Sequence, residues 1–189
     1  MILPESRSPF LCGKNRYLGG MKIRNLFYIE KMDKWDFYSI LIYLIITLII
    51  YFDSYGLITR NIVLFYSYLT PLCLYLFNYK SLRKFNVWVI WFFISLFHII
   101  LYHEISGIPK YMFYRGPASN SLKFTWLFLL LFQLLRIVSI KFQRLELVAP
   151  NKGSLDIWDN RKLTFIDNIC FVIFGAVFIF MGIVDYLFN

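Results

Sequence analysis

Long apolar stretches, separated by short polar connections, dominate the chain. Each comes close to the roughly 20 apolar residues that an α-helix needs to cross a bilayer, within a range of about 17–25. Apolar runs of this length exceed ordinary strands, and the strands of a membrane barrel would alternate in polarity instead. The pattern therefore predicts an all-α, polytopic integral membrane protein built as a bundle of five transmembrane helices. The predicted spans are 37–52, 62–79, 85–102, 124–140 and 165–187.

The composition supports this prediction. Of the 189 residues, 59% are hydrophobic and only 16% are charged, whereas soluble domains have about 25% charged residues. One core does not need so much apolar surface, so the excess is expected to face lipid. This argues against an ordinary water-soluble enzyme, a disordered protein and a disulfide-stabilised scaffold. The three cysteines show no CxxC spacing and are expected to be reduced, packed thiols.

The basic residues are unevenly divided between the predicted connections. Fifteen of the 20 Lys and Arg residues lie before the first span, after the second and after the fourth. The opposite side has four: Arg60, Lys110, Arg115 and Lys123. Since the basic side of multi-spanning proteins is cytoplasmic, we expect a protein of the cytoplasmic (inner) membrane with its N-terminus in the cytoplasm and its C-terminus outside. This topology also accounts for the net charge of +9, so no nucleic-acid partner is predicted.

Residues 1–35 form a basic cytoplasmic arm, and 36–189 form the transmembrane domain. The arm lacks the apolar core of a secretory signal, and either Met1 or Met21 can be the start of the chain. The apolar residues just before the first span can share one helical face, which predicts a short interfacial amphipathic segment; the alternative is a basic flank that only sets topology. These residues are Tyr28, Ile29, Met32 and Trp35.

A polar cluster is predicted within the fourth and fifth spans. Ionisable side chains inside a membrane are costly unless they are paired or hydrated, so they point to function. The positions of Arg136 and Asp167 place them at the same depth, where they can form an ion pair. The cluster is either a pocket for an anionic headgroup, a substrate or a proton, or it is structural, with Arg136 snorkelling and Asp167 at a helix start. Its candidate residues are Gln133, Arg136, Ser139, Asp167 and Asn168.

A second candidate group lies on the predicted outer face and consists of Asp53, His98, His103 and Glu104. The two histidines are five residues apart and therefore point to different helical faces, whereas a metal site on one helix needs a spacing of three or four. No metal and no cofactor is predicted. The chain also lacks the GxSxG, Walker A, HExxH and Rossmann glycine motifs. This argues against an enzyme without excluding one.

Small residues on the fifth span predict helix packing. Asn168, Gly175 and Gly182 recur every seven residues on one face, and glycines allow helices to approach closely. Pro71 predicts a kink in the second span, because proline removes a backbone hydrogen bond.

The small size, the scarce catalytic groups and the packing stripes favour an accessory or assembly subunit of a membrane complex. One alternative is a small transporter or channel subunit that uses the Pro71 bend and the cluster around Arg136. Another is a membrane enzyme that acts on lipid-linked substrates. The expected partners are membrane lipids, including anionic headgroups, and a membrane protein or a second copy of the chain.

Overall fold

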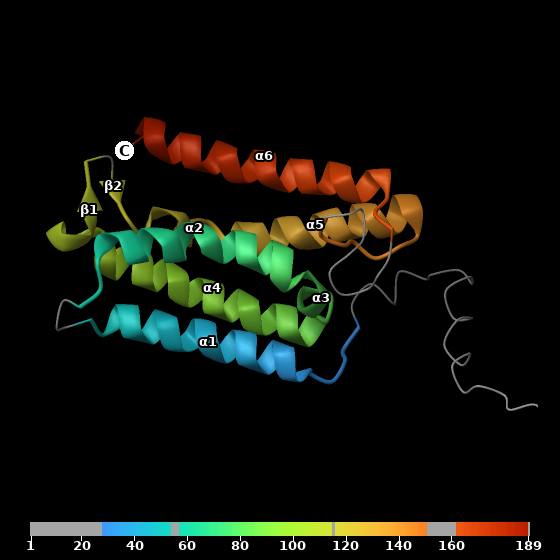
Figure 1. Ribbon diagram of the computed structural model, residues 1–189, viewed down its shortest axis with the longest axis horizontal. Helices are drawn as coiled ribbons and strands as arrows, with labels where there is room; N and C mark the ends of the chain where they lie inside the picture. Colours follow the sequence, from blue (N-terminus) through green and yellow to red (C-terminus); the bar gives the residue numbers. More distant parts are fainter. Residues whose placement is uncertain (1–27, 54–56, 115, 151–161, 189) are drawn as a thin grey trace, which may run out of the picture.

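The computed structural model describes residues 28–53, 57–114, 116–150 and 162–188, and these ranges are mostly helical (Figure 1). The predicted all-α class is confirmed. The expectations about residues 1–27 and Arg115, including the choice between Met1 and Met21, lie outside the described residues. Within these ranges the α-helices are α1 (Lys34–Tyr51), α2 (Arg60–Phe77), α3 (Tyr79–Leu82), α4 (Phe85–Ser106), α5 (Thr125–Gln143) and α6 (Phe165–Phe188).

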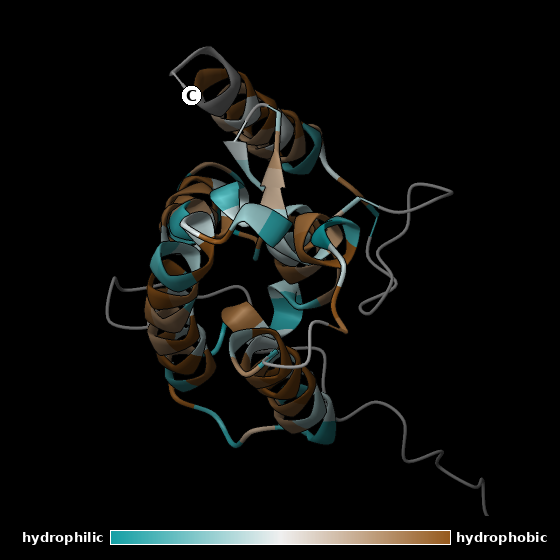
Figure 2. Cartoon of the chain, turned by 90° about the vertical axis from the view of Figure 1, so that its left-hand side faces the viewer, coloured by the Kyte–Doolittle hydropathy of each residue, from teal (hydrophilic) through white to brown (hydrophobic). Residues whose placement is uncertain are grey.

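The five long helices lie side by side, and consecutive ones run in opposite directions (Figure 1). One end of the bundle carries α3, and we refer to it as the α3 end. The opposite end carries a short antiparallel pair, β1 (Met112–Phe113) and β2 (Gly116–Pro117), and we refer to it as the hairpin end. Helix α6 lies at the edge of the bundle in both Figure 1 and Figure 2.

Four stretches of the described chain are long and apolar enough to cross a membrane, one fewer than predicted. They are α1, α4, Asn120–Gln143 and Phe165–Val184. Helix α2 is not among them. It begins with Arg60 and Asn61, and Pro71 lies within it, so its average hydropathy is lower than the apolar run alone suggests. Helix α2 nevertheless runs alongside the other long helices and is continuous through Pro71.

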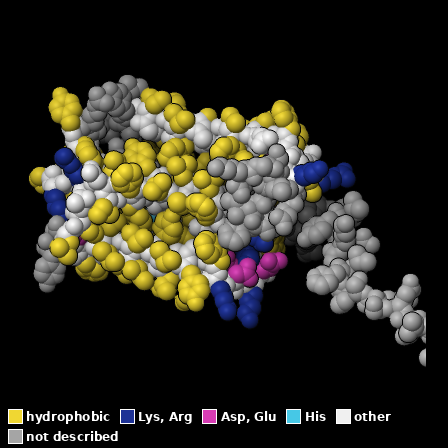
Figure 3. Space-filling model, in the orientation of Figure 1, with side chains coloured by type: hydrophobic (Ala, Val, Ile, Leu, Met, Phe, Trp, Pro, Cys, Tyr) yellow, Lys and Arg dark blue, Asp and Glu magenta, His cyan; other side chains and the backbone are white. Residues whose placement is uncertain are grey.

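Apolar side chains cover the outside of the bundle. Large ones such as Phe65, Phe97, Leu134 and Val172 are at least 60% exposed. Hydrophobic side chains also dominate the face of the molecule that Figure 3 shows. Seen from the hairpin end, the long helices are coloured mainly as hydrophobic (Figure 2). Soluble monomers rarely expose contiguous apolar patches of this kind, so the surface is compatible with a membrane location.

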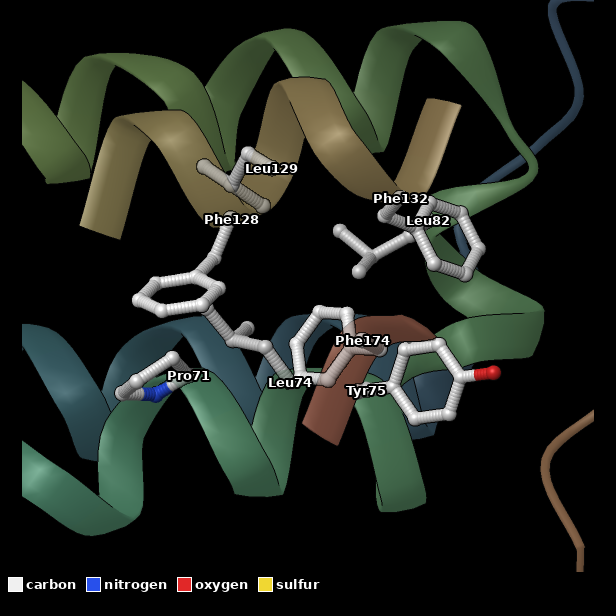
Figure 4. A pocket seen from close by; sticks show the side chains of 8 residues that line it. All are labelled: Pro71, Leu74, Tyr75, Leu82, Phe128, Leu129, Phe132 and Phe174. Carbon is white, nitrogen blue, oxygen red and sulfur yellow. The ribbon is translucent and has the colours of Figure 1, made fainter. Parts of the chain in front are cut away.

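The core consists mainly of aromatic and branched side chains shared by all the long helices. Tyr75 of α2 stacks on Phe174 of α6, with ring centroids 4.2 Å apart. This pair borders a small apolar pocket between α2, α3, α5 and α6, which Pro71 also lines (Figure 4). The pocket has room for about one water molecule at most, so it offers no space for a substrate.

The connection between α4 and α5 is folded onto the hairpin end. It contains two 3-10 helices, η3 (Pro109–Tyr111) and η4 (Asn120–Phe124), with the β1–β2 pair between them. Helix η4 packs against both α4 and α2. Ser67 of α2 donates a hydrogen bond to the carbonyl of Ala118, at an Oγ–O distance of 2.8 Å. This connection therefore closes one end of the bundle.

Candidate functional site

Arg136 is the centre of a buried polar network at the α3 end. It lies on α5 and is only 1% exposed. Its Nε and Nη2 donate to the two carboxylate oxygens of Glu146, at 2.8 and 2.9 Å. The guanidinium also lies over the ring of Tyr28, 5.3 Å from its centroid. A bidentate pair of this kind, with an aromatic face beside it, compensates the cost of burying the guanidinium.

The ion pair of Arg136 thus forms with Glu146, whereas the sequence predicts Asp167. Glu146 lies in the connection after α5, outside every predicted span. The chain reverses there because Arg144 adopts a left-handed backbone conformation with φ of 55°. This reversal brings residues 145–149, which we call the strap, back against the end of the bundle. An apolar Leu-Val-Ala run directly after a polar helix end is the one sequence signal that could have indicated it.

Hydrogen bonds join the strap to α5, to the start of α6 and to Arg83 at the end of α3. Arg83, which follows α3, donates through Nε and Nη2 to the carbonyl of Leu147 at 3.1 and 2.6 Å. Ser139 of α5 donates to the carbonyl of Leu145 at 3.0 Å. The backbone N–H of Val148 points to Asp167 Oδ1 at 3.5 Å. Leu147, Val148 and Ala149 are at most 1% exposed, so the strap is part of the core.

Asp167 is fully buried in the first turn of α6. Its Oδ2 accepts from the backbone N–H of Thr164 at 3.0 Å, and the N–H of Asp167 donates to Thr164 Oγ1 at 3.3 Å. This reciprocal arrangement is a capping box, in which Thr164 is the residue that caps the helix. Gln143 of α5 also donates to Asp167 Oδ1 at 3.1 Å. Asp167 is therefore joined to the network through Gln143.

The predicted cluster is largely assembled, with one exception. Gln133, Arg136, Ser139 and Asp167 are buried at the α3 end, and Gln133 donates to the carbonyl of Leu82 at 2.9 Å. Asn168, in contrast, is exposed on another face of α6. The cluster is a cross-link between α5, α6, the strap and the α3 region.

A second ion cluster joins the start of α1 to the start of α4. Lys84 donates to Asp33 at 2.6 Å and to Asp36 at 2.8 Å, and Asp36 is almost completely buried. Burial alone would lower the pKa of Lys84, but the hydrogen bonds to these two carboxylates outweigh it and hold the pKa above its ordinary value. In the sequence, Lys84 is only a topology signal, and no partner is predicted for it.

Residues 28–33 contain no helix in the structure, whereas the sequence predicts a short amphipathic helical segment there. Tyr28 pairs with Lys84 as a β-bridge, its carbonyl accepts from the N–H of Phe85 at 2.9 Å, and α1 begins only at Lys34. The β-bridge to Lys84 and the ion pair of Lys84 with Asp33 hold this segment against the start of α4. These contacts determine its conformation, and the helical repeat of its apolar residues does not. Burial, and next the nearby Glu146 carboxylate, raise the pKa of Tyr28 to about 12.

The candidate residues of the hairpin end are not brought together. The two histidines lie on different faces of α4, as their spacing predicts: His98 is fully buried inside the bundle, whereas His103 is exposed, and so is Glu104. Asp53 has its own partners: it accepts from Lys110 Nζ at 2.9 Å and from Tyr111 Oη at 2.6 Å. Among the residues that the structure describes, no group of three His, Cys, Asp or Glu is arranged to hold a metal ion.

Replacing Asp53 with Asn is expected to loosen the connection after α1. Asp53 also accepts from the N–H groups of Leu57 and Ile58, at 2.9 and 3.2 Å, and loss of its charge weakens all four hydrogen bonds. Amide exchange at Leu57 and Ile58 should become faster by on the order of tenfold, measured by hydrogen–deuterium exchange. The variant Lys110→Met is the control, because it leaves both amide hydrogen bonds in place. Equal exchange in Asp53→Asn and the wild type would contradict this role.

The same cluster has a defined dependence on pH. The hydrogen bonds from Lys110 and Tyr111 hold the pKa of Asp53 well below its ordinary value of 3.8. A carboxylate whose pKa is lowered on folding contributes stability that is complete above its unfolded pKa and is lost as the pH falls through the folded pKa. The slow exchange at Leu57 and Ile58 should therefore persist through pH 5.

The predicted packing face of α6 has no described neighbour. A Cβ atom added at Gly175 or Gly182 would meet nothing within 4 Å. Helix α6 instead packs on α2 and α5 through its aromatic side chains, as in the stacking of Phe174 on Tyr75 and the contact of Phe178 with Tyr68. Within the described residues, the two glycines do not serve as an internal contact.

Comparison of the chain with known protein families, curated proteins and solved structures finds no match. The function must therefore be inferred from the geometry of the chain itself.

Proposed function

We propose that the protein crosses the cytoplasmic membrane five times, with α2 as a fifth span and with the α3 end in the cytoplasm. Two observations support this proposal. Helix α2 runs parallel to the four candidate spans over a similar length (Figure 1). The described basic residues are also more numerous at the α3 end than at the hairpin end, where they are Arg60, Lys110 and Lys123, and the basic side of such proteins faces the cytoplasm.

Within this topology, anionic lipid headgroups are the proposed lipid partners at the α3 end. Basic and aromatic side chains are adjacent and exposed at two helix ends there: Lys34 with Trp35 on α1, and Lys141 with Phe142 on α5. Lysines at such positions extend toward the headgroups, and aromatic rings favour the same depth.

The proposed function is that of an accessory or assembly subunit, which acts by binding another membrane protein or a second copy of itself. The observation that carries this proposal is the Asn168, Gly175 and Gly182 face of α6. Helix α6 is the least buried of the four candidate spans, and at both glycines its surface is open to close approach by another helix. The buried charges Arg136 and Lys84 meanwhile have partners within the chain and serve its own architecture.

A leucine scan of α6 tests this function. Gly175→Leu and Gly182→Leu should abolish the assembly and leave the fold intact, because a Cβ atom added at either position meets no described atom within 4 Å. Ala176→Leu is the matched control, since Ala176 is exposed on another face of the same helix. Native mass spectrometry of the protein, purified in mild detergent, reports the stoichiometry. A wild-type protein that is only monomeric, or glycine variants that keep the assembly, would overturn the proposal.

A further inference from the structure

Three buried side chains form a hydrogen-bonded chain inside the bundle, between its middle and the hairpin end. Thr47 of α1, Tyr66 of α2 and His98 of α4 are each less than 10% exposed, and His98 is fully buried. The Thr47 Oγ1 to Tyr66 Oη distance is 2.7 Å, and the Tyr66 Oη to His98 Nε2 distance is 3.0 Å. Thr47 Oγ1 also lies 2.7 Å from the carbonyl oxygen of Tyr43, one turn earlier on α1.

The direction of these hydrogen bonds follows from counting protons. The carbonyl of Tyr43 can only accept, so it receives the single hydroxyl proton of Thr47. Tyr66 must then donate to Thr47, and His98 must donate to Tyr66 through Nε2. A neutral imidazole carries only one N–H, so this assigns the proton of His98 to Nε2 and leaves Nδ1 with a lone pair.

Nδ1 of His98 is buried and has no hydrogen-bond partner among the described residues. The same holds for the hydroxyl oxygens of Ser119, just before η4, and of Thr125, at the start of α5. Helix η4 packs on the two helices that carry Tyr66 and His98. Buried polar atoms without a partner are rare and costly, so the lone pair of His98 Nδ1 calls for a hydrogen-bond donor from outside the described chain.

We propose that Nδ1 of His98 is the acceptor at a binding site for a small hydrogen-bond donor within the bundle, and that its occupant is a water molecule. Buried waters typically make about three hydrogen bonds to polar groups that are otherwise unsatisfied. A neutral donor fits better than a proton, because an imidazolium here would be a buried cation and none of its hydrogen bonds goes to a carboxylate. This inference is independent of the proposed subunit function.

Solid-state NMR of the full chain in lipid bilayers tests the site directly, because the chain has only two histidines. With isotope-labelled histidine, His98 should show a protonated Nε2, an unprotonated Nδ1 and magnetisation transfer from water to Nδ1 at neutral pH. The exposed His103 is an internal control that must show water contact. The variant His103→Gln assigns the two signals without altering the buried network.

The possible results separate clearly. An unprotonated Nδ1 with water contact supports the site. A signal with the proton on Nδ1, or a doubly protonated ring, would overturn the hydrogen-bond assignment and with it the site. An unprotonated Nδ1 without water contact, in a sample where His103 shows such contact, would overturn the choice of water as the occupant.

Discussion

Glu146→Ala is expected to lower the free energy of unfolding by roughly 3 kcal/mol, because truncating one partner of a buried ion pair leaves the other charge uncompensated. The guanidinium of Arg136 is 1% exposed and receives both of its carboxylate contacts from Glu146. The variant should also release the strap, since Glu146 lies within it. Reversible unfolding in detergent micelles measures the loss of stability. Limited proteolysis within the strap reports its release, because a detached strap is cleaved faster.

Two variants show whether the loss comes from the buried charge. The double variant Arg136→Met with Glu146→Met removes both charges and should recover most of the stability, because apolar replacement of a buried pair is often neutral. Glu104→Ala is the control for removing an acidic residue, since Glu104 is exposed, and it should change stability by no more than about 0.5 kcal/mol. If Glu146→Ala behaves like Glu104→Ala, the pair does not stabilise the bundle.

Lys84→Met is expected to have an effect of similar size, roughly 3 kcal/mol, because it leaves the Asp36 carboxylate buried without its cation. The side chain of Asp36 is 2% exposed, and that of Asp33 is 68% exposed. Asp33→Asn is therefore the matched control at the same lysine, and it should cost less than about 1 kcal/mol. Both are measured by unfolding in the same micelles. If the two variants lost equal stability, the burial of Asp36 would not explain the effect of Lys84→Met.

The Lys84 contribution should not change between pH 7 and 9. A lysine whose pKa is raised on folding contributes stability that is complete below its unfolded pKa and is lost as the pH rises through the folded pKa. Since the pKa of Lys84 lies above its ordinary value of 10.5, the difference between wild type and Lys84→Met should decline only in strongly alkaline solution.

The sequence predicted much of the helical arrangement, because apolar length is a local property. It located α1, α4, α5 and α6 to within a few residues, and the three-residue spacings of Gln133, Arg136 and Ser139 placed them on one face of a helix, which the structure buries. The five-residue separation of His98 and His103 likewise placed them on different faces of one helix, and the structure buries the first and exposes the second. Each of these conclusions depends only on the geometry of a single helix.

The partners of these residues could not be predicted in the same way. Glu146 reaches Arg136 only because the chain reverses at Arg144, and Lys84 reaches Asp36 across 48 residues of sequence. Both contacts depend on how the connecting segments fold back on the bundle. The hydropathy pattern of the sequence does not predict this folding. The lysines and arginines outside the apolar runs were assigned to topology alone, and the structure gives Arg83 and Lys84 a second role as buried cross-links.

The Lys84 cluster also has a consequence for biosynthesis. Asp36 lies at the start of the first long helix, and its cation is made 48 residues later. At about 5–20 residues per second, the ribosome needs roughly 2–10 s to supply it. During that interval the Asp36 carboxylate has no cation to accompany it into the core, so its burial has to wait. The order of synthesis therefore favours late closure of the α3 end, after α4 has begun to emerge.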